Sequence, residues 1–237
     1  SIDLVIFTPN ALCYMRAKSF SYKEPETLEW IERFGGKDRV LFDIGANIGI
    51  YSIYNSLLHN STCIAFEPSF FNLKQLTKNI NINKCENLIS VVTNPLSDSL
   101  GFSDFLNGNI DEGGALSAFG VNYGYDGDAI QSECKTNVLG CSLDKLFELK
   151  LIKTKPNFIK IDVDGIEHLI LNGALKVLSF DECKSVLIEV NDDFEKQAIQ
   201  VSRILKNCGF KLEEKRHAEE FENNLHFGRT YNQIWVK

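Results

Sequence analysis

The sequence contains no Cys-x-x-Cys pair and no long hydrophobic run. Its seven cysteines are odd in number and several lie inside apolar stretches, which argues against a disulfide framework or a zinc site and favours core thiols in a reducing compartment. No window is apolar over the length that a membrane span needs, and residues 1–18 lack the basic-then-apolar layout of a signal peptide. We therefore expect a cytoplasmic protein without a membrane span.

A surplus of basic residues is missing as well. The chain has 25 Lys and Arg against 32 Asp and Glu, a formal net charge of -7, which argues against nucleic acid or an anionic membrane surface as the main partner. With 237 residues, of which 44% are hydrophobic and 24% are charged, the chain can bury one substantial core, so one domain with insertions is favoured over two. The sequence does not specify an oligomeric state.

Residues 40–51 form the stretch around which the remaining chain is organised. A short apolar run leads into a turn built from Gly45, Asn47 and Gly49, and an apolar-periodic segment follows. This pattern predicts a buried strand that feeds a helix. Glycines permit backbone angles that a side chain would block and let a ligand lie against the main chain, and asparagine is one of the few other residues that tolerate a positive φ. The turn therefore predicts a nucleotide-binding α/β unit.

A carboxylate follows this turn at the spacing typical of a ribose ligand. Glu67 closes the apolar run of residues 62–66, roughly 20 residues past the glycines, where such folds place the acid that accepts the two ribose hydroxyls. An ordinary strand-end carboxylate is less favoured, because the glycine turn precedes it. No Gly-Lys-Ser/Thr follows the turn, which excludes a phosphate-binding loop.

Strands and helices alternate along most of the chain. The apolar runs predict parallel strands at residues 40–44, 62–66, 88–92, 158–163 and 185–190. The helical periodicity predicts helices at residues 50–58, 70–83, 142–150, 166–178 and 194–207. Two further strand candidates, residues 210–214 and 233–237, have no helix between them, so they should pair as an antiparallel hairpin at the far end of the sheet. An ordinary dinucleotide-binding fold would continue with parallel units instead.

The first 36 residues are expected to cap a main domain that spans residues 37–237. Residues 2–8 have the pattern of a strand stopped by Pro9. Residues 25–34 begin with proline and carry an early acid, which predicts a helix that ends at the following Gly-Gly pair. We expect this segment to lie over the ligand pocket.

An insertion is expected at residues 101–140, where the regular alternation stops. Strand candidates at 102–106 and 136–139 flank a loop, residues 107–131, that is rich in Gly, Asn, Asp and Ser. A loop of this length in a compact domain is usually functional or disordered. Its aromatic residues favour a lid that faces a substrate over a mobile insertion: Phe119, Tyr123 and Tyr125.

Four motifs follow one another along the chain: FDIGANIG at residues 42–49, FEP at 66–68, SLDKL at 142–146 and KIDVDGIE at 160–167. In this order they resemble the FkbM family of S-adenosylmethionine-dependent methyltransferases. Together the matches span about residues 43–190, most of the chain. The family usually has Glu at the position of Asp164, which is a mild chemical departure.

The resemblance implies a class I methyltransferase fold. This is a Rossmann-like, doubly wound α/β fold with a mostly parallel seven-stranded sheet and an antiparallel C-terminal hairpin. The resemblance also implies S-adenosylmethionine as cofactor and methyl transfer to an oxygen, commonly a hydroxyl of a saccharide or secondary metabolite. The expected partner is therefore a small-molecule or saccharide acceptor.

The same resemblance assigns the cofactor contacts. Glu67 would bind the ribose. Asn72 could reach the adenosine side, although a solvated helix position is favoured for it. The methionine portion would face five residues in and before the turn: Asp43, Gly45, Ala46, Asn47 and Gly49.

Acidic residues at the end of the strand at 158–163 are candidates for the chemistry. Asp162 and Asp164 stand at the carboxyl end, where ligands of open α/β sheets gather. An alcohol of high pKa needs a positioned base or a metal to remove its proton. His168 could be this base or, equally, a half-buried structural residue. Glu167 could instead bond backbone donors at the helix start.

A divalent metal is possible but not favoured. Asp162, Glu189 and Asn191 end adjacent strands and could form an oxygen-rich site. The favoured alternative is that these acids pair with nearby bases. His217 and His226 lie near the terminal hairpin, where either could reach the acceptor, but surface positions are favoured for both.

Two other functions stay open. An NAD-dependent oxidoreductase uses similar glycine turns, although the turn spacing and the terminal hairpin count against it. A non-catalytic binding module could retain the fold and the cofactor pocket.

Overall fold

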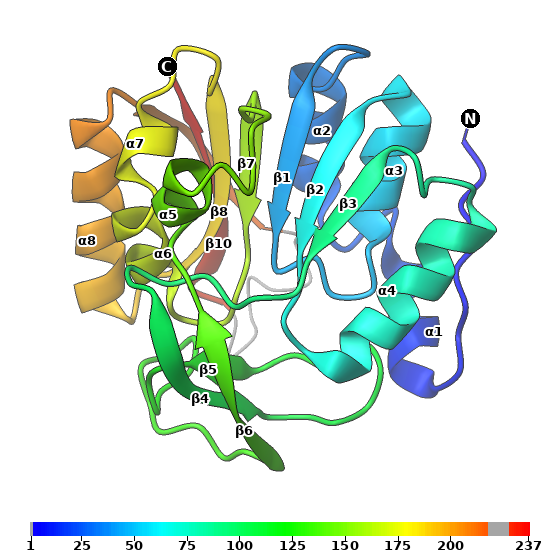
Figure 1. Cartoon of the computed structure of the whole chain (residues 1–237), viewed down its shortest axis with the longest axis horizontal. Coiled ribbons are helices and arrows are strands. Elements are labelled where there is room, and N and C mark those ends of the chain that lie inside the picture. Colours follow the sequence, from blue (N-terminus) through cyan, green and yellow to red (C-terminus); the bar gives the residue numbers. More distant parts are fainter. Residues whose placement is uncertain (1, 218–227) are drawn as a thin grey trace.

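Seven strands form the central sheet of the computed structural model, which describes residues 2–217 and 228–237 (Figure 1). Their order across the sheet is β3-β2-β1-β7-β8-β10-β9. The strands are β1 Val40–Ile44, β2 Thr62–Phe66, β3 Ile89–Val92, β7 Phe158–Ile161, β8 Ser185–Asn191, β9 Lys211–Arg216 and β10 Thr230–Val236. Neighbours from β3 to β8 are parallel, and β10 runs antiparallel to both β8 and β9. The predicted mostly parallel sheet with an antiparallel C-terminal hairpin is confirmed.

Helices cover both faces of this sheet, as Figure 1 shows. One layer contains α2 (Pro25–Phe34), α3 (Ile50–His59) and α4 (Phe70–Ile82). The other layer contains α5 (Leu143–Glu148), α6 (Glu167–Asn172), α7 (Leu175–Leu178) and α8 (Glu195–Asn207). The fold is therefore doubly wound. None of the helices in the described ranges has the length and apolar character needed to cross a membrane.

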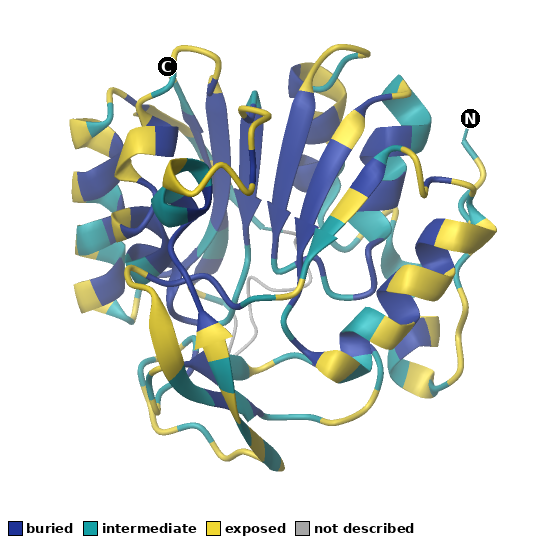
Figure 2. Ribbon diagram, in the orientation of Figure 1, coloured by how far each residue is buried: buried dark blue, intermediate teal, exposed yellow. Residues whose placement is uncertain are grey.

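Alternate strand residues serve the two helix layers. On β1, Phe42 and Ile44 belong to the apolar core on the side of α5 to α8, whereas Leu41 belongs to the core on the side of α2 to α4. On β7, Ile159 and Phe158 are divided in the same way. Successive side chains of a strand point to opposite faces, so a strand between two helix layers is apolar at most positions, and Asp43 and Lys160 are the exceptions on β1 and β7. Figure 2 shows the resulting burial along the central strands.

The prediction of one helix over residues 166–178 is wrong. Two short helices, α6 and α7, replace it and meet near Gly173, although Ile166 and Leu178 are buried as expected. A Cβ at Gly173 would lie 2.1 Å from the carbonyl oxygen of Ser97. The chain therefore breaks the helix where it touches a distant backbone segment, a contact that helical periodicity does not encode.

The strand predicted over residues 2–8 is also wrong. The segment is extended, but its partners are side chains of the α4 region and not another strand. The Val5 N–H donates to Asn83 Oδ1 and the Phe7 N–H donates to Asn79 Oδ1, both at 3.0 Å. Asparagine amides thus replace the backbone groups of a neighbouring strand.

A helix that the sequence did not indicate, α1 (Ala11–Ser19), follows this segment. Asn10 caps α1, because its side-chain oxygen accepts a hydrogen bond from the Cys13 N–H at 2.9 Å. The helix predicted over residues 25–34 is confirmed as α2, with Pro25 in its first turn. Both helices reach the carboxyl end of the sheet, but the boundary of a separate cap remains a prediction.

The insertion forms a second sheet below the carboxyl ends of the parallel strands (Figure 1). Its three strands, in the order β5-β4-β6, pair antiparallel. They are β4 Gly101–Asn107, β5 Ser117–Phe119 and β6 Cys134–Gly140. The strands predicted at 102–106 and 136–139 are confirmed as β4 and β6.

A side chain at residue 45 should destabilise the fold. Gly45 has a φ of +85°, and a Cβ built there would lie 1.9 Å from the Asp162 carbonyl oxygen. We expect Gly45→Ala to lower the free energy of unfolding by at least about 2 kcal/mol, because a left-handed residue and a backbone clash are both unfavourable. Urea denaturation measures this loss.

Gly101→Ala is the matched control, since its Cβ position has no heavy atom within 4 Å. We expect it to change the free energy of unfolding by less than about 0.5 kcal/mol. Equal stabilities of the two variants would contradict the close approach of β1 and β7.

Candidate active site

Two adjoining cavities open at the carboxyl ends of the parallel strands. The larger has a volume of about 390 Å³ and the smaller about 80 Å³. Five residues line both cavities, so the cavities meet at the junction of β1 and β7: Gly45, Asn47, Ala115, Asp162 and Asp164. The carboxyl edge of an open α/β sheet is the place where such folds bind ligands.

The turn after β1 presents backbone to the larger cavity. Gly45 and Asn47 have φ values of 85° and 52°, so the positive φ expected at the asparagine is present. The N–H groups of Gly45 and Ala46 both donate to the Phe66 carbonyl at 3.0 Å, which fixes the turn against the end of β2. Gly45, Ala46 and Asn47 line the larger cavity, as expected of a cofactor turn.

Two residues of the predicted set, Asp43 and Gly49, line neither cavity. Asp43 is 1% exposed and accepts a hydrogen bond from the Ser52 hydroxyl at 2.6 Å. Gly49 precedes α3, and a Cβ there would lie 2.3 Å from the Leu76 side chain. Both residues therefore support the turn from beneath, and neither faces one of the two cavities.

Glu67 joins the turn to the smaller cavity. Its carboxylate is 5% exposed and accepts the Asn47 N–H and the Ser69 N–H, each at 2.8 Å. Burial raises the pKa of this carboxyl to about 7. Each oxygen keeps a further lone pair, so the carboxylate can accept additional donors from a ligand in this cavity.

The loop predicted to be a lid lies across both cavities. Asn72 holds it from α4, because its Oδ1 accepts the Gly113 N–H at 2.9 Å and its Nδ2 donates to the Gly114 carbonyl at 3.1 Å. The Asn47 side chain donates to the same carbonyl at 2.8 Å. Asn72 is 5% exposed, so the solvated position favoured for it is wrong. It lines the smaller cavity, as the adenosine-side alternative requires.

The aromatic residues of the loop differ in placement. Phe119 lines the smaller cavity, whereas Tyr123 packs edge-on against Phe194 with ring centroids 5.5 Å apart. Tyr123 and Tyr125 line neither cavity. The part of the loop that faces the larger cavity is instead Ala115 and Leu116.

An ion pair stands at the junction of the cavities. Lys160 is 1% exposed, and its Nζ lies 2.7 Å from Asp162 Oδ2. Burial opposes the charge of this lysine, but the carboxylates of Asp162 and Asp43 outweigh that effect and raise its pKa. Burial also opposes the charge of Asp162, and Lys160 outweighs it, so the pKa of the Asp162 carboxyl lies below its usual value. Asp162 is thus an ionised carboxylate held in place.

The sequence analysis did not single out Lys160. The available signal was a lysine inside the otherwise apolar strand β7, two residues before an aspartate. Because alternate strand residues share a face, this spacing places the two side chains together.

Asp164 supports the loop. It has a φ of 63°, and its Oδ2 accepts the Leu116 N–H at 2.8 Å and the Ser117 N–H at 3.3 Å. Burial, followed by the charge of Asp162, raises its pKa to about 6. Asp164 therefore lines both cavities while holding the loop that covers them.

Glu167 has the structural role expected of it. It is 2% exposed and accepts the N–H groups of Gly165 at 3.1 Å and Val163 at 3.2 Å, together with a hydrogen bond from the Gln197 side chain. Burial raises its pKa to about 7. It fixes the backbone that carries Asp162 and Asp164.

His168 is not brought to the cavities. Its ring is 4% exposed, lies edge-on to Phe194 with centroids 6.4 Å apart and lines neither cavity. Burial lowers its pKa. His168 is therefore placed as a structural residue and not as a base, because this part of α6 faces α8 and not the sheet edge.

The three candidate metal ligands are not assembled into one site. Asp162 and Glu189 line the larger cavity, but Asn191 does not, and its Oδ1 accepts the Asp193 N–H at 3.0 Å. Within residues 2–217 and 228–237, no group of three or more His, Cys, Asp or Glu side chains is arranged to hold a metal ion.

Of the two C-terminal histidine candidates, the structure describes His217. The surface position favoured for His217 is wrong, because this residue is partly buried and lines the larger cavity. His226 lies outside the described residues.

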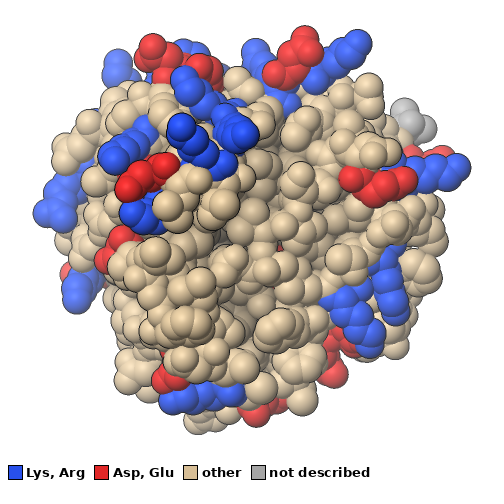
Figure 3. Space-filling view, viewed as in Figure 1, with Lys and Arg blue, Asp and Glu red and all other residues tan. Residues whose placement is uncertain are grey.

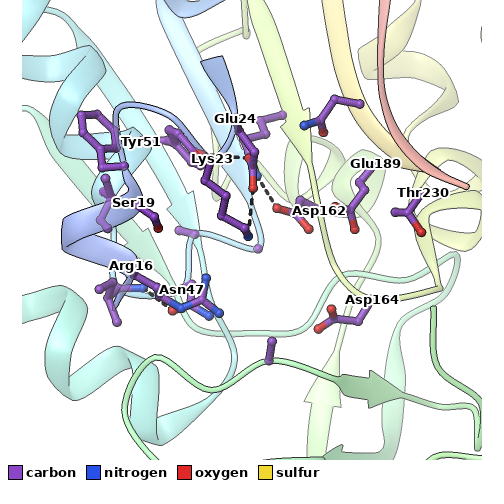
Figure 4. A pocket seen from close by; sticks show the side chains of 18 of the residues that line it. Arg16, Ser19, Lys23, Glu24, Asn47, Tyr51, Asp162, Asp164, Glu189 and Thr230 are labelled. Atoms are coloured by element: carbon purple, nitrogen blue, oxygen red, sulfur yellow. Dashed lines mark hydrogen bonds and ion pairs between the residues drawn. The ribbon is translucent and has the colours of Figure 1, made fainter. Parts of the chain in front are cut away.

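The N-terminal segment, which was expected to lie over the ligand pocket, supplies a wall of the larger cavity through residues that the sequence analysis did not name. Arg16, Ser19 and Lys23 come from α1 and the residues after it, and Figure 4 shows them opposite Asp162 and Glu189. Glu24 accepts a hydrogen bond from the Tyr51 hydroxyl at 2.8 Å, which ties this wall to α3. No periodicity or motif marks these residues in the sequence, because α1 reaches the site only through tertiary packing.

The pH dependence of stability should report on Glu67. Its pKa is raised from 4.5 to about 7 on folding, so its contribution to stability is complete below about pH 4.5 and is lost as the pH rises through about 7. Between about pH 4 and pH 8, the wild type should lose roughly 3 kcal/mol relative to Glu67→Gln. Chemical denaturation across this range measures the difference. Glu86→Gln, in an exposed turn, is the control and should keep the pH dependence of the wild type. If the stability of Glu67→Gln varied with pH in parallel with that of the wild type, the raised pKa of Glu67 would be contradicted.

Known proteins share this sequence pattern and fold. The methyltransferase FkbM domain model matches residues 43–212. The hexuronic acid methyltransferase AglP of Haloferax volcanii is 28% identical over 155 residues, which are 65% of this chain and 57% of that protein. The chain therefore spans less than two thirds of the length of this curated relative.

Two solved structures illustrate the similarity of the fold. The methyltransferase FkbM of Methylobacillus flagellatus has a TM-score of 0.58 at 15% identity, over 85% of this chain and 44% of that chain. A Streptococcus mutans protein solved in complex with S-adenosylhomocysteine has a TM-score of 0.55 at 9% identity, over 90% and 96% of the two chains. At such identities these matches bear on the fold alone. Because the family model covers most of the chain, the protein belongs to the FkbM methyltransferase family.

Proposed function

We propose that this protein transfers the methyl group of S-adenosylmethionine to a hydroxyl oxygen of a saccharide or a related secondary metabolite. The observation that carries the proposal is the meeting of the two cavities at Asp162. The smaller cavity has a buried carboxylate, Glu67, and the larger has space for an acceptor. A cofactor that crosses from one to the other would present its reactive group beside the Asp162 carboxylate.

The residues of the smaller cavity fit an adenosine group. Phe66, Leu96, Phe105 and Phe119 give it apolar walls, and Glu67 offers acceptor oxygens to the two ribose hydroxyls. The Gly45 turn leaves room for a ligand directly against the main chain. These features support S-adenosylmethionine as the cofactor.

Asp162 is the residue that we assign to the acceptor hydroxyl. When bound, S-adenosylmethionine would supply an electrophilic methyl group, whose bond to sulfur breaks as the bond to the acceptor oxygen forms, so that S-adenosylhomocysteine is left. Asp162 accepts a hydrogen bond from the attacking hydroxyl, orients its oxygen and receives its proton as the new bond forms. Lys160 keeps the carboxylate ionised and fixed, and the loop held by Asp164 and Asn72 excludes water from the junction.

A saccharide acceptor is supported by the similarity to a hexuronic acid methyltransferase. The larger cavity is lined by polar groups from several elements, as a hydroxyl-rich ligand requires. On the face seen in Figure 3, lysines, arginines and acids are interspersed around an uncharged centre, and this mixed surface supports a small acceptor over a nucleic-acid backbone. The N-terminal segment, through Arg16 and Lys23, would cap the acceptor side.

Calorimetry with S-adenosylmethionine, S-adenosylhomocysteine and NAD tests the cofactor. We expect the first two to bind and NAD not to bind, because Glu67 and the Gly45 turn fit one adenosine group and the turn spacing differs from that of dinucleotide folds. Glu67→Gln should weaken binding of S-adenosylhomocysteine by roughly 10-fold, since one of the two acceptor oxygens is replaced by an amide donor. Binding of NAD alone would replace this proposal with an oxidoreductase.

Methyl transfer to a panel of hexuronic acids and neutral hexoses tests the chemistry. On the fastest acceptor, Asp162→Asn should lower kcat by about 100-fold or more, because proton removal is lost, while S-adenosylhomocysteine affinity changes little. His168→Gln should keep kcat, since His168 lies outside both cavities.

The same assay separates the alternatives that remain. An effect of His168→Gln equal to that of Asp162→Asn would refute the assignment of Asp162. Loss of activity on addition of EDTA would show that the reaction requires a metal ion, which would contradict the proposed mechanism. Cofactor binding without turnover on any acceptor would leave a binding module.

A further inference from the structure

Two buried polar atoms in the larger cavity lack hydrogen-bond partners among the described residues. They are Glu26 Oε2 and Thr230 Oγ1, and the two residues are 1% and 7% exposed. Nearly all buried polar groups in proteins are hydrogen-bonded, because an unsatisfied one costs free energy. Two such atoms in one cavity wall leave hydrogen-bonding positions that a ligand can fill.

These atoms belong to one patch built from three elements. Glu26 lies in the first turn of α2, and its Oε1 accepts a hydrogen bond from Asn232 Nδ2 at 2.7 Å. Asn232 is the cross-strand partner of Glu189 on β8. Thr230 stands two residues before Asn232 on β10, so their side chains share a face of the sheet. We call Glu26, Glu189, Thr230 and Asn232 the acceptor patch.

The acceptor patch lies beside the proposed reaction centre. Figure 4 shows Glu189 between Asp162 and Thr230, with all three side chains turned toward the cavity. Burial, followed by the charge of Asp162, raises the pKa of Glu189 well above its usual value, as expected of carboxyl groups that lie close together. A ligand on the patch is therefore within reach of Asp162.

The acceptor patch is suited to ligand groups that donate hydrogen bonds. It presents two carboxyl groups and a threonine oxygen, and the amide donor of Asn232 is already directed at Glu26. Sugar hydroxyls can donate to these oxygens and accept in return from the Thr230 hydroxyl. Arg16 and Lys23, two of the cations that line the cavity, come from the N-terminal segment.

We propose that the acceptor patch binds those hydroxyl groups of a saccharide acceptor that are not methylated, and so holds the reacting hydroxyl toward Asp162. This assignment rests on the proposed methyltransferase function and adds the residues that recognise the acceptor. A carboxylate on the sugar would point away from the patch, toward Arg16 and Lys23. The acceptor patch thus recognises the hydroxyl groups of the sugar, and Arg16 and Lys23 recognise its carboxylate.

Binding of D-glucuronic acid to the protein saturated with S-adenosylhomocysteine tests the patch without requiring turnover. Titration followed by NMR or calorimetry gives the dissociation constant. We expect Glu26→Gln to weaken sugar binding by roughly 10- to 100-fold, because an amide donor replaces the acceptor oxygen. Thr230→Val, which removes only the hydroxyl, should weaken it by roughly 3- to 10-fold.

The control is Glu32→Gln, the same substitution at an exposed position of α2, which should leave sugar binding unchanged. All three variants should bind S-adenosylhomocysteine as the wild type does, since none of these residues lines the smaller cavity. A glucuronic acid that lacks the hydroxyl bound by Glu26 cannot make this hydrogen bond. It should therefore bind the wild type and Glu26→Gln with equal affinity.

Each other outcome overturns a specific step. If sugar binds the wild type, Glu26→Gln and Thr230→Val alike, the patch does not recognise the acceptor although the methyltransferase proposal stands. If S-adenosylhomocysteine binds but neither D-glucuronic acid, D-galacturonic acid nor D-glucose does, the patch is not a saccharide site. If S-adenosylhomocysteine itself fails to bind, the proposed function fails before the patch is at issue.

Discussion

The contact between the backbones at Gly45 and Asp162 is the constraint on which the site depends. The Asp162 carbonyl oxygen lies where a Cβ of residue 45 would stand, so the ends of β1 and β7 can come together only over a glycine. Their approach brings the turn after β1 beside the carboxylate that follows β7, and both line the two cavities. One packing contact therefore fixes where a cofactor can lie and where an acid can act.

The charges at this junction stabilise one another as a set. Lys160 on β7 is buried against Asp162, which directly follows that strand, and pairs in register with Asp43 on β1. Because the Asp162 side chain is 29% exposed and Lys160 also interacts with Asp43, removing Asp162 should cost less than the ~3–5 kcal/mol typical of a fully buried pair. The same set divides the acids of the cavity into two kinds. Despite burial, the charge of Lys160 lowers the pKa of Asp162, whereas burial and the neighbouring carboxylates, Asp162 first among them, raise the pKa of Glu189.

The sequence could predict the parts of the site that lie at strand ends. Glycine turns and carboxylates that directly follow apolar runs must meet at one edge of a parallel sheet, which is why the placement of Gly45, Glu67 and Asp162 followed from the pattern. It could not predict α1, because those residues reach the cavity only through packing of distant segments. His168 shows a third limit: periodicity located a helix there but did not distinguish a side chain facing α8 from one facing the sheet edge. The acceptor patch was equally hidden, since Glu26 and Thr230 are far apart in sequence and meet only across α2 and β10.

The loop over the cavities is held by the same side chains that line them. Asn47, Asn72 and Asp164 each bond the backbone of residues 113–117, and each also faces the smaller cavity. A ligand that contacts one of these side chains therefore changes the free energy of the closed loop, and by linkage the opening of the loop changes the affinity for that ligand by the same amount. Under the proposed function, the residence time of a cofactor would therefore depend on the rate at which a few hydrogen bonds of this glycine-rich segment break.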